Sequence, residues 1–139
     1  MTRVELNLSY IFSTEFAVRD YECDIQGILN NSVYQNYMEH TRHEYLKSLG
    51  HDFAELHTRG IDPVVYRVEI DFVTPLKSGD TCVCKLALEK EGNLKAVFRQ
   101  DIFRVSDDRL CASGKIIAVV LQNNRPVRPD FLLFPPENK

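Results

Sequence analysis

The chain has 139 residues, of which 44% are hydrophobic and 27% are charged, and its formal net charge is −3. One domain is the simplest expectation at this length, and such a chain can bury roughly two thirds of its unfolded surface in one core. Without a basic surplus, the sequence argues against nucleic-acid binding. The longest apolar run, Ile116 to Leu121, is far shorter than the ~20 residues that a membrane-spanning helix requires.

The N-terminal sequence MTRVELNLSYIF lacks the basic segment, apolar block and cleavage site that together make a signal peptide. We therefore expect a cytoplasmic protein that does not engage a membrane. The four cysteines include no CxxC pair, so we predict reduced and mostly buried thiols. His40 and His43 have helical spacing, but no further residue completes a ligand set, so we predict neither a metal nor another cofactor.

The first half of the chain predicts a strand, a polar turn and a long helix. The strand covers Tyr10 to Glu22, and the turn covers Cys23 to Gly27. Asn30, Asn31 or Ser32 can cap the helix, and Gly50 can end it. A shorter helix is expected from Asp52 to Thr58. One apolar stripe at helical spacing supports the long helix, formed by Tyr34, Met38, Thr41, Tyr45 and Leu49.

The second half predicts strands in an antiparallel meander. Apolar and polar residues alternate through four segments, and the last is apolar on both faces after Lys115, which predicts an internal position. Residues from about 123 to 139 contain four prolines and are expected to form a surface tail. One helix against one antiparallel sheet predicts an α+β fold in a single domain, residues 1–139. The four strands are Tyr66–Phe72, Cys82–Glu89, Leu94–Val105 and Leu110–Leu121.

The turn before the long helix carries the residues best suited to chemistry. Asp24 lies between strand and helix, and Gly27 permits a tight turn with close backbone approach by a ligand. The unpaired N–H groups of a helix N-terminus, here near Asn30 and Asn31, can polarise a carbonyl. A carboxylate beside them can activate water or attack as a nucleophile. Asp and Gly are also common turn residues, so the local sequence leaves a purely structural role open.

The segment from Val18 to Gly50 resembles the signature of the hot-dog-fold acyl thioesterases of the 4-hydroxybenzoyl-CoA thioesterase group. The family pattern is an Asp, a Gly three residues later, a Tyr ten residues after the Asp, and then Glu and Arg on the helix. In this chain those positions are Asp24, Gly27, Tyr34, Glu39 and Arg42. The short sequences RDYE, NN and RHE most resemble plastid acyl-lipid thioesterases of plants and their bacterial relatives, which act on fatty acyl-carrier-protein thioesters.

The resemblance implies an antiparallel sheet wrapped around one long central helix, and hydrolysis of an acyl-CoA or acyl-ACP thioester without a cofactor. It implies that Asp24 is the general base or nucleophile. The backbone near Asn30 and Asn31 would polarise the carbonyl, and Gly27 and Tyr34 would contact substrate. Many family members carry His where this chain has Asn31, and an amide cannot carry a proton near neutral pH.

The resemblance also implies a cleft between two protomers, so we expect a homodimer or a homotetramer. An alternative is a non-catalytic module that binds an acyl thioester or an acyl carrier protein. A hot-dog dehydratase or hydratase is disfavoured, because those enzymes pair a His with a carboxylate and this helix begins with Asn30 and Asn31.

Overall fold

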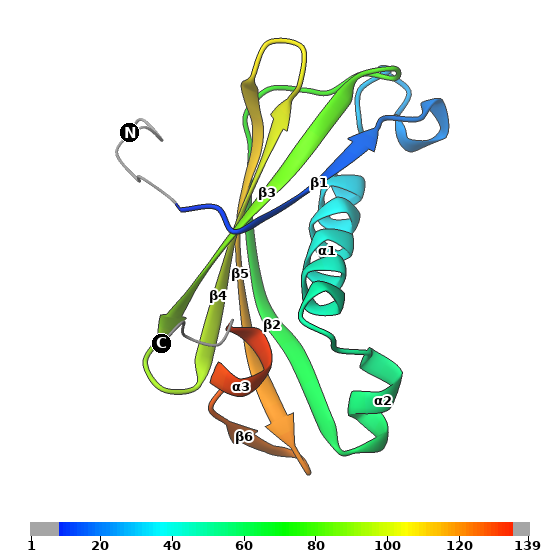
Figure 1. Ribbon diagram of the computed structural model, residues 1–139. Coiled ribbons are helices and arrows are strands. Elements are labelled where there is room, and N and C mark those ends of the chain that lie inside the picture. Colours follow the sequence, from blue (N-terminus) through cyan, green and yellow to red (C-terminus); the bar gives the residue numbers. More distant parts are fainter. Residues whose placement is uncertain (1–8, 135–139) are drawn as a thin grey trace.

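A computed structural model describes residues 9–134 as one twisted antiparallel sheet with a long helix on one face (Figure 1). The strands are ordered β1–β3–β4–β5–β2, and β6 pairs with β5. This arrangement confirms the expected α+β architecture. The bounds are β1 (Phe12–Ala17), η2 (Asp20–Glu22), α1 (Asn31–Ser48), α2 (Phe53–Thr58), β2 (Ile61–Phe72), β3 (Thr81–Glu91), β4 (Lys95–Arg104), β5 (Arg109–Gln122), β6 (Arg125–Val127) and α3 (Asp130–Leu133).

The strand order corrects the predicted meander. β3, β4 and β5 are consecutive neighbours, but β2 pairs with β5 and not with β3. The segment between β2 and β3 therefore carries the chain from one edge region of the sheet to the other. β5 lies between β4 and β2, which confirms the predicted internal position. Its apolar residues on both faces suit a strand that is covered on both sides.

The first strand is shorter than predicted. β1 ends at Ala17, and residues Asp20–Glu22 form the 3-10 turn η2. The carboxylate of Glu22 accepts a hydrogen bond from the backbone N–H of Arg19 at 3.0 Å, and this local bond favours the turn over a continued strand. The chain therefore leaves β1 at Ala17, and five residues separate this point from Cys23, where the turn that carries Asp24 begins.

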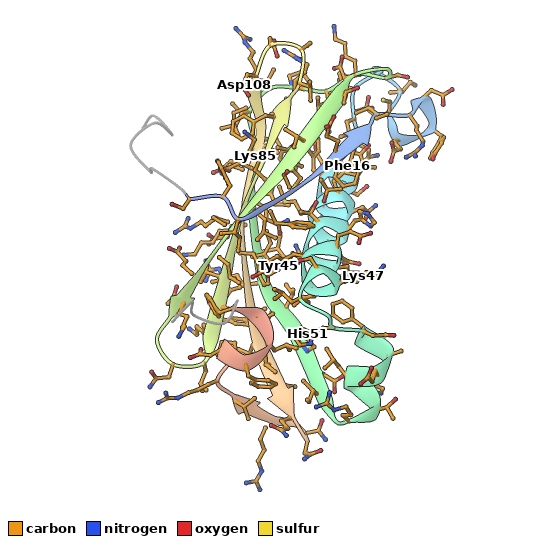
Figure 2. The ribbon with its side chains drawn as sticks, in the orientation of Figure 1. Phe16, Tyr45, Lys47, His51, Lys85 and Asp108 are labelled. Atoms are coloured by element: carbon orange, nitrogen blue, oxygen red, sulfur yellow. The ribbon has the colours of Figure 1, made fainter. Side chains whose placement is uncertain are left out.

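Helix α1 packs on the sheet through the predicted stripe. Figure 2 shows Tyr45 pointing from α1 toward the sheet and Lys47 pointing away from it. Met38 and Thr41 are fully buried, whereas Leu49 is partly exposed. Gly114 on β5 lets the helix approach closely, because a Cβ there would lie 2.8 Å from the sulfur of Met38. The helix therefore has a fixed position against the sheet, and this fixes its N-terminus as well.

The expected surface tail is wrong for the described part of the C-terminal segment. β6 extends the sheet, and α3 places Leu132 and Leu133 in the core with no exposed surface. The hydroxyl of Tyr45 donates to the carbonyl of Leu133 at 2.7 Å. Although the segment contains prolines, it packs on the core because burial of each of the two adjacent leucines stabilises the fold by roughly 1.5–3 kcal/mol. Residues 135–139 lie outside the described range.

No helix in residues 9–134 is both long and apolar enough to cross a membrane. The thiols of Cys82, Cys84 and Cys111 are free and buried, and that of Cys23 is partly exposed. Burial raises the pKa of Cys82 to about 12 and that of Cys84 to about 11, so both stay protonated near neutral pH. These thiols serve as core packing.

Candidate active site

Asp24 opens a tight turn that ends at the start of α1. Its backbone N–H donates to the carbonyl of Ile28 at 2.8 Å, and its own carbonyl accepts from Gly27 at 2.9 Å. Gly27 has a φ of +81°, a conformation that glycine adopts without strain. A bridge between Cys23 and Leu29 closes the base of the turn. The chain therefore folds back on itself and brings Asp24 beside the residues that begin α1.

The carboxylate of Asp24 has a structural role in this turn. One oxygen, Oδ1, accepts the backbone N–H of Gln26 at 2.9 Å and that of Ile28 at 3.4 Å. Oδ2 has no hydrogen-bond donor among the residues that the structure describes, and the side chain is exposed. The turn therefore fixes the orientation of the carboxylate through one oxygen and leaves the other to face solvent or a ligand.

Asn30 is the N-cap of α1. Its side-chain oxygen accepts the backbone N–H of Ser32 at 3.1 Å and the hydroxyl of the same residue at 3.0 Å. The carbonyl of Asn30 accepts from Val33. Within residues 9–134, the backbone N–H of Asn31 has no acceptor. This N–H, at the positive end of the helix dipole, is the donor that can polarise a bound carbonyl.

A hollow of about 190 Å³ lies between the start of α1 and the end of β2. Asn31 and Tyr34 line it together with Phe72 and Val73, whereas Asp24 and Gly27 lie on the adjoining turn. The structure thus brings two of the predicted residues into one hollow and keeps the predicted carboxylate beside it.

Tyr34 is buried, and its ring meets that of Phe72 edge to face at 5.3 Å. Its hydroxyl oxygen accepts the backbone N–H of Leu76 at 3.2 Å. Burial raises the pKa of Tyr34, so the phenol keeps its proton. Among the described residues, that proton has no acceptor, so the hydroxyl keeps the capacity to donate one hydrogen bond.

Sequence reasoning placed Arg42 on the helix without assigning its environment, and it missed Gln100 altogether. Both are buried, and Arg42 Nη1 donates to Gln100 Oε1 at 2.9 Å. Gln100 Nε2 in turn donates to the carbonyl of Met38 at 2.8 Å. The signal that could have found this pair is a glutamine between Phe98 and Ile102 on an otherwise apolar strand face.

The histidines on α1 have local partners. His40 lies 3.4 Å from Glu44, and the ring of His43 lies 4.5 Å from that of Phe53. Burial lowers the pKa of His43, so its imidazole is neutral near pH 7. In residues 9–134, no group of three or more His, Cys, Asp or Glu side chains is arranged to hold a metal ion.

The comparison with protein families identifies the chain. A family model described as the thioesterase superfamily matches residues 26–112, which is more than half of the chain. The chain therefore belongs to the thioesterase superfamily, and the resemblance seen in the sequence is confirmed.

Two similar curated relatives are acyl-acyl carrier protein thioesterases of Arabidopsis thaliana, named ATL3 and ATL2 and described as chloroplastic. The chain is 37% identical to the first over 87% of its own length and 36% identical to the second over 82%. It spans 64% and 61% of the lengths of these two relatives.

A solved structure confirms the hot-dog fold. The crystal structure of a 1,4-dihydroxy-2-naphthoyl-CoA thioesterase from Synechocystis superposes with a TM-score of 0.78. The match covers 84% of this chain and 88% of that one, at 17% identity. At this identity the likeness concerns the fold, a curled antiparallel sheet packed against one long helix.

Proposed function

We propose that the protein is an acyl thioesterase that hydrolyses an acyl-CoA or fatty acyl-ACP thioester to the free acid and the thiol. The observation that carries the proposal is the carboxylate of Asp24, held by its turn beside the N-terminus of α1, in a chain of the thioesterase superfamily. The two Arabidopsis relatives, which are named for acyl-ACP, support a carrier-protein thioester as one candidate substrate.

The proposed reaction needs few groups. The N–H of Asn31 and the hydroxyl of Tyr34 donate to the thioester carbonyl, and Gly27 lets the substrate approach the backbone. Asp24 Oδ2 removes a proton from water as the water attacks, or attacks the carbonyl itself to form an anhydride that water then opens. The C–S bond breaks, and the thiolate leaves with little proton assistance because thiols have a pKa of about 8.5.

A substrate panel tests this function. Thiol release is measured with acyl-CoA and acyl-ACP thioesters of short, medium and long aliphatic chains and with aromatic acyl groups. Turnover with at least one class is the expected result. Saturable binding without hydrolysis over hours would favour the alternative of a binding module, for which the structural use of Asp24 Oδ1 is the favouring observation.

The Tyr34→Phe variant tests the proposed donor. Removing the hydroxyl takes away one hydrogen bond to the carbonyl and leaves the ring packing in place, so we expect kcat to fall about 100- to 1,000-fold with little change in KM. The buried N–H of Leu76 loses its acceptor, which costs about 1–3 kcal/mol of stability. Steady-state kinetics and urea denaturation separate the two effects, and an unchanged kcat would rule out the donor role.

We also propose that the protein is a homodimer with the active site in the cleft between protomers. β2 is an edge strand in the described sheet, and apolar side chains are exposed along and just beyond it. An open edge with exposed apolar residues is typical of strands that pair with a second chain. The exposed residues are Val64, Val65, Tyr66, Phe72 and Val73. A homotetramer stays a further prediction.

Sedimentation equilibrium tests whether two protomers pair through the edge strand β2. The double variant Val64→Glu/Phe72→Glu places like charges along β2, and we expect it to sediment as a monomer. Val105→Glu is the matched control, because Val105 is a 50% exposed apolar residue just past the end of β4. A double variant that keeps the wild-type mass would contradict pairing through β2.

A cytoplasmic location also stays a prediction, for which cell fractionation is the test.

A further inference from the structure

A second cavity, of about 350 Å³, lies beneath the C-terminal half of α1. In Figure 1 the C-terminal half of α1 is its lower half, and α2 and α3 lie below it on either side of β2. Its volume falls in the range of small-molecule sites. The walls are mainly apolar and come from five elements besides α1, with Phe53, Val65, Phe98, Ala118 and Leu133 among them.

A cation borders this apolar cavity. Arg42 lines the cavity and is only 7% exposed, and its guanidinium carbon lies 6.0 Å from the centre of the Phe98 ring. Gln100 accepts one of the five guanidinium N–H groups, and Arg42 forms no salt bridge within residues 9–134. No fully enclosed side-chain nitrogen in this range is without a partner, so Nε and Nη2 of Arg42, which have no hydrogen-bond partner, each keep some exposed surface.

This cavity is separate from the hollow at the start of the helix. Arg42 follows Asn31 by eleven residues, which corresponds to ~17 Å along the helix axis. The fully buried side chain of Met38 lies on α1 between Tyr34, which lines the hollow, and Arg42, which lines the cavity. The cavity therefore has no part in the proposed attack on the thioester within one protomer.

The other polar groups at the cavity are Glu39 and His43, both exposed. His43 is neutral near pH 7, as its lowered pKa requires. Glu39 forms no salt bridge with Arg42, although its charge partly offsets the burial that lowers the pKa of Arg42. An apolar wall with one buried, partly unpaired guanidinium suits an apolar molecule that ends in a carboxylate, because charge-assisted bonds to guanidinium are strong.

We propose that this cavity is a second ligand site, which binds an apolar carboxylic acid with its carboxylate on Arg42 and its hydrocarbon part against Phe98, Ala118 and Leu133. The ligand is either a free acid or the far, carboxylate-bearing end of an acyl group. The site goes beyond the proposed hydrolysis, and its occupancy can be measured in the absence of any turnover.

Isothermal titration with sodium octanoate tests the site, with methyl octanoate as the uncharged comparison. We expect octanoate to bind the wild type saturably and at least tenfold more tightly than the ester. Arg42→Gln weakens octanoate binding tenfold or more, because the charge-assisted bonds are lost. Arg99→Gln is the matched control and binds as the wild type does, since Arg99 pairs with Glu89 outside the cavity lining.

A second variant keeps the test decisive if Arg42→Gln fails to fold. Ala118→Leu fills the cavity and retains the guanidinium, and it also weakens octanoate binding tenfold or more. Octanoate binding that is absent, no tighter than that of the ester, or unaffected by Ala118→Leu would overturn the proposal. Inhibition kinetics separate the two sources: a free acid at its own site lowers the maximal rate, whereas an acid in the place of an acyl end raises KM.

Discussion

Asp24→Asn is expected to lower kcat by about 100- to 10,000-fold, the range that a general base contributes. The substitution isolates the charge, because an asparagine oxygen can still accept the N–H groups of Gln26 and Ile28. The turn should therefore persist, and the free energy of unfolding should change by no more than about 0.5 kcal/mol. Thiol release measures the activity, and urea denaturation measures the stability.

Asp20→Asn is the matched control for Asp24. Asp20 is an exposed carboxylate four residues upstream, and its Oδ1 likewise accepts a backbone N–H, that of Tyr21 at 2.9 Å. We expect this variant to keep wild-type turnover. Equal turnover by Asp24→Asn and the wild type would remove Asp24 from the reaction.

Gln100→Leu is expected to destabilise the fold by about 3 kcal/mol, the largest stability effect that we predict for a single polar residue. Gln100 has no exposed surface, and it joins the guanidinium of Arg42 to the carbonyl of Met38. Leucine fills much of the same volume but leaves the buried cation without its acceptor. Urea denaturation measures the loss, and Gln35→Leu, on the exposed side of α1, should change stability by no more than about 0.5 kcal/mol.

The double variant Gln100→Leu/Arg42→Met shows whether the lost stability comes from the unpaired cation. Replacing both partners by apolar residues removes the charge that needed an acceptor, and such replacements are often neutral. We therefore expect the double variant to be more stable than Gln100→Leu alone. Strictly additive losses would mean that the two side chains act independently and that the hydrogen bond between them contributes little.

Much of the fold was predictable because its signals are local. The periodicity of α1, the cap at Asn30 and the alternation in β3, β4 and β5 depend on residues close together in the chain. The strand order was not predictable from the sequence, because no local pattern in β2 indicates that this strand pairs with β5 and not with β3. The C-terminal segment was mistaken for a tail since its four prolines are visible in the sequence, whereas the space that receives Leu132 and Leu133 is not.

The candidate site was likewise predictable in part from the sequence, and the rest of it required the structure. The sequence placed Asp24, Gly27, Asn30, Asn31 and Tyr34 on one strand–turn–helix unit, and the structure brings Asn31 and Tyr34 into one hollow with Asp24 on the adjoining turn. The sequence could not show that Asp24 Oδ1 also holds the turn, or that Tyr34 accepts the N–H of Leu76, because such bonds depend on orientation and on distant backbone.

The sequence by itself determined an α+β fold, a formal net charge of −3, a long helix with a capped start, and a pattern that belongs to thioesterases. Only the tertiary structure decided that β2 is an edge, that the C-terminal leucines complete the core, and that Arg42 borders an apolar cavity. The physical reason is that periodicity and capping act between neighbours in the chain. The pairing of strands and the burial of a charge depend on residues that meet only after folding, as Arg42 meets Gln100.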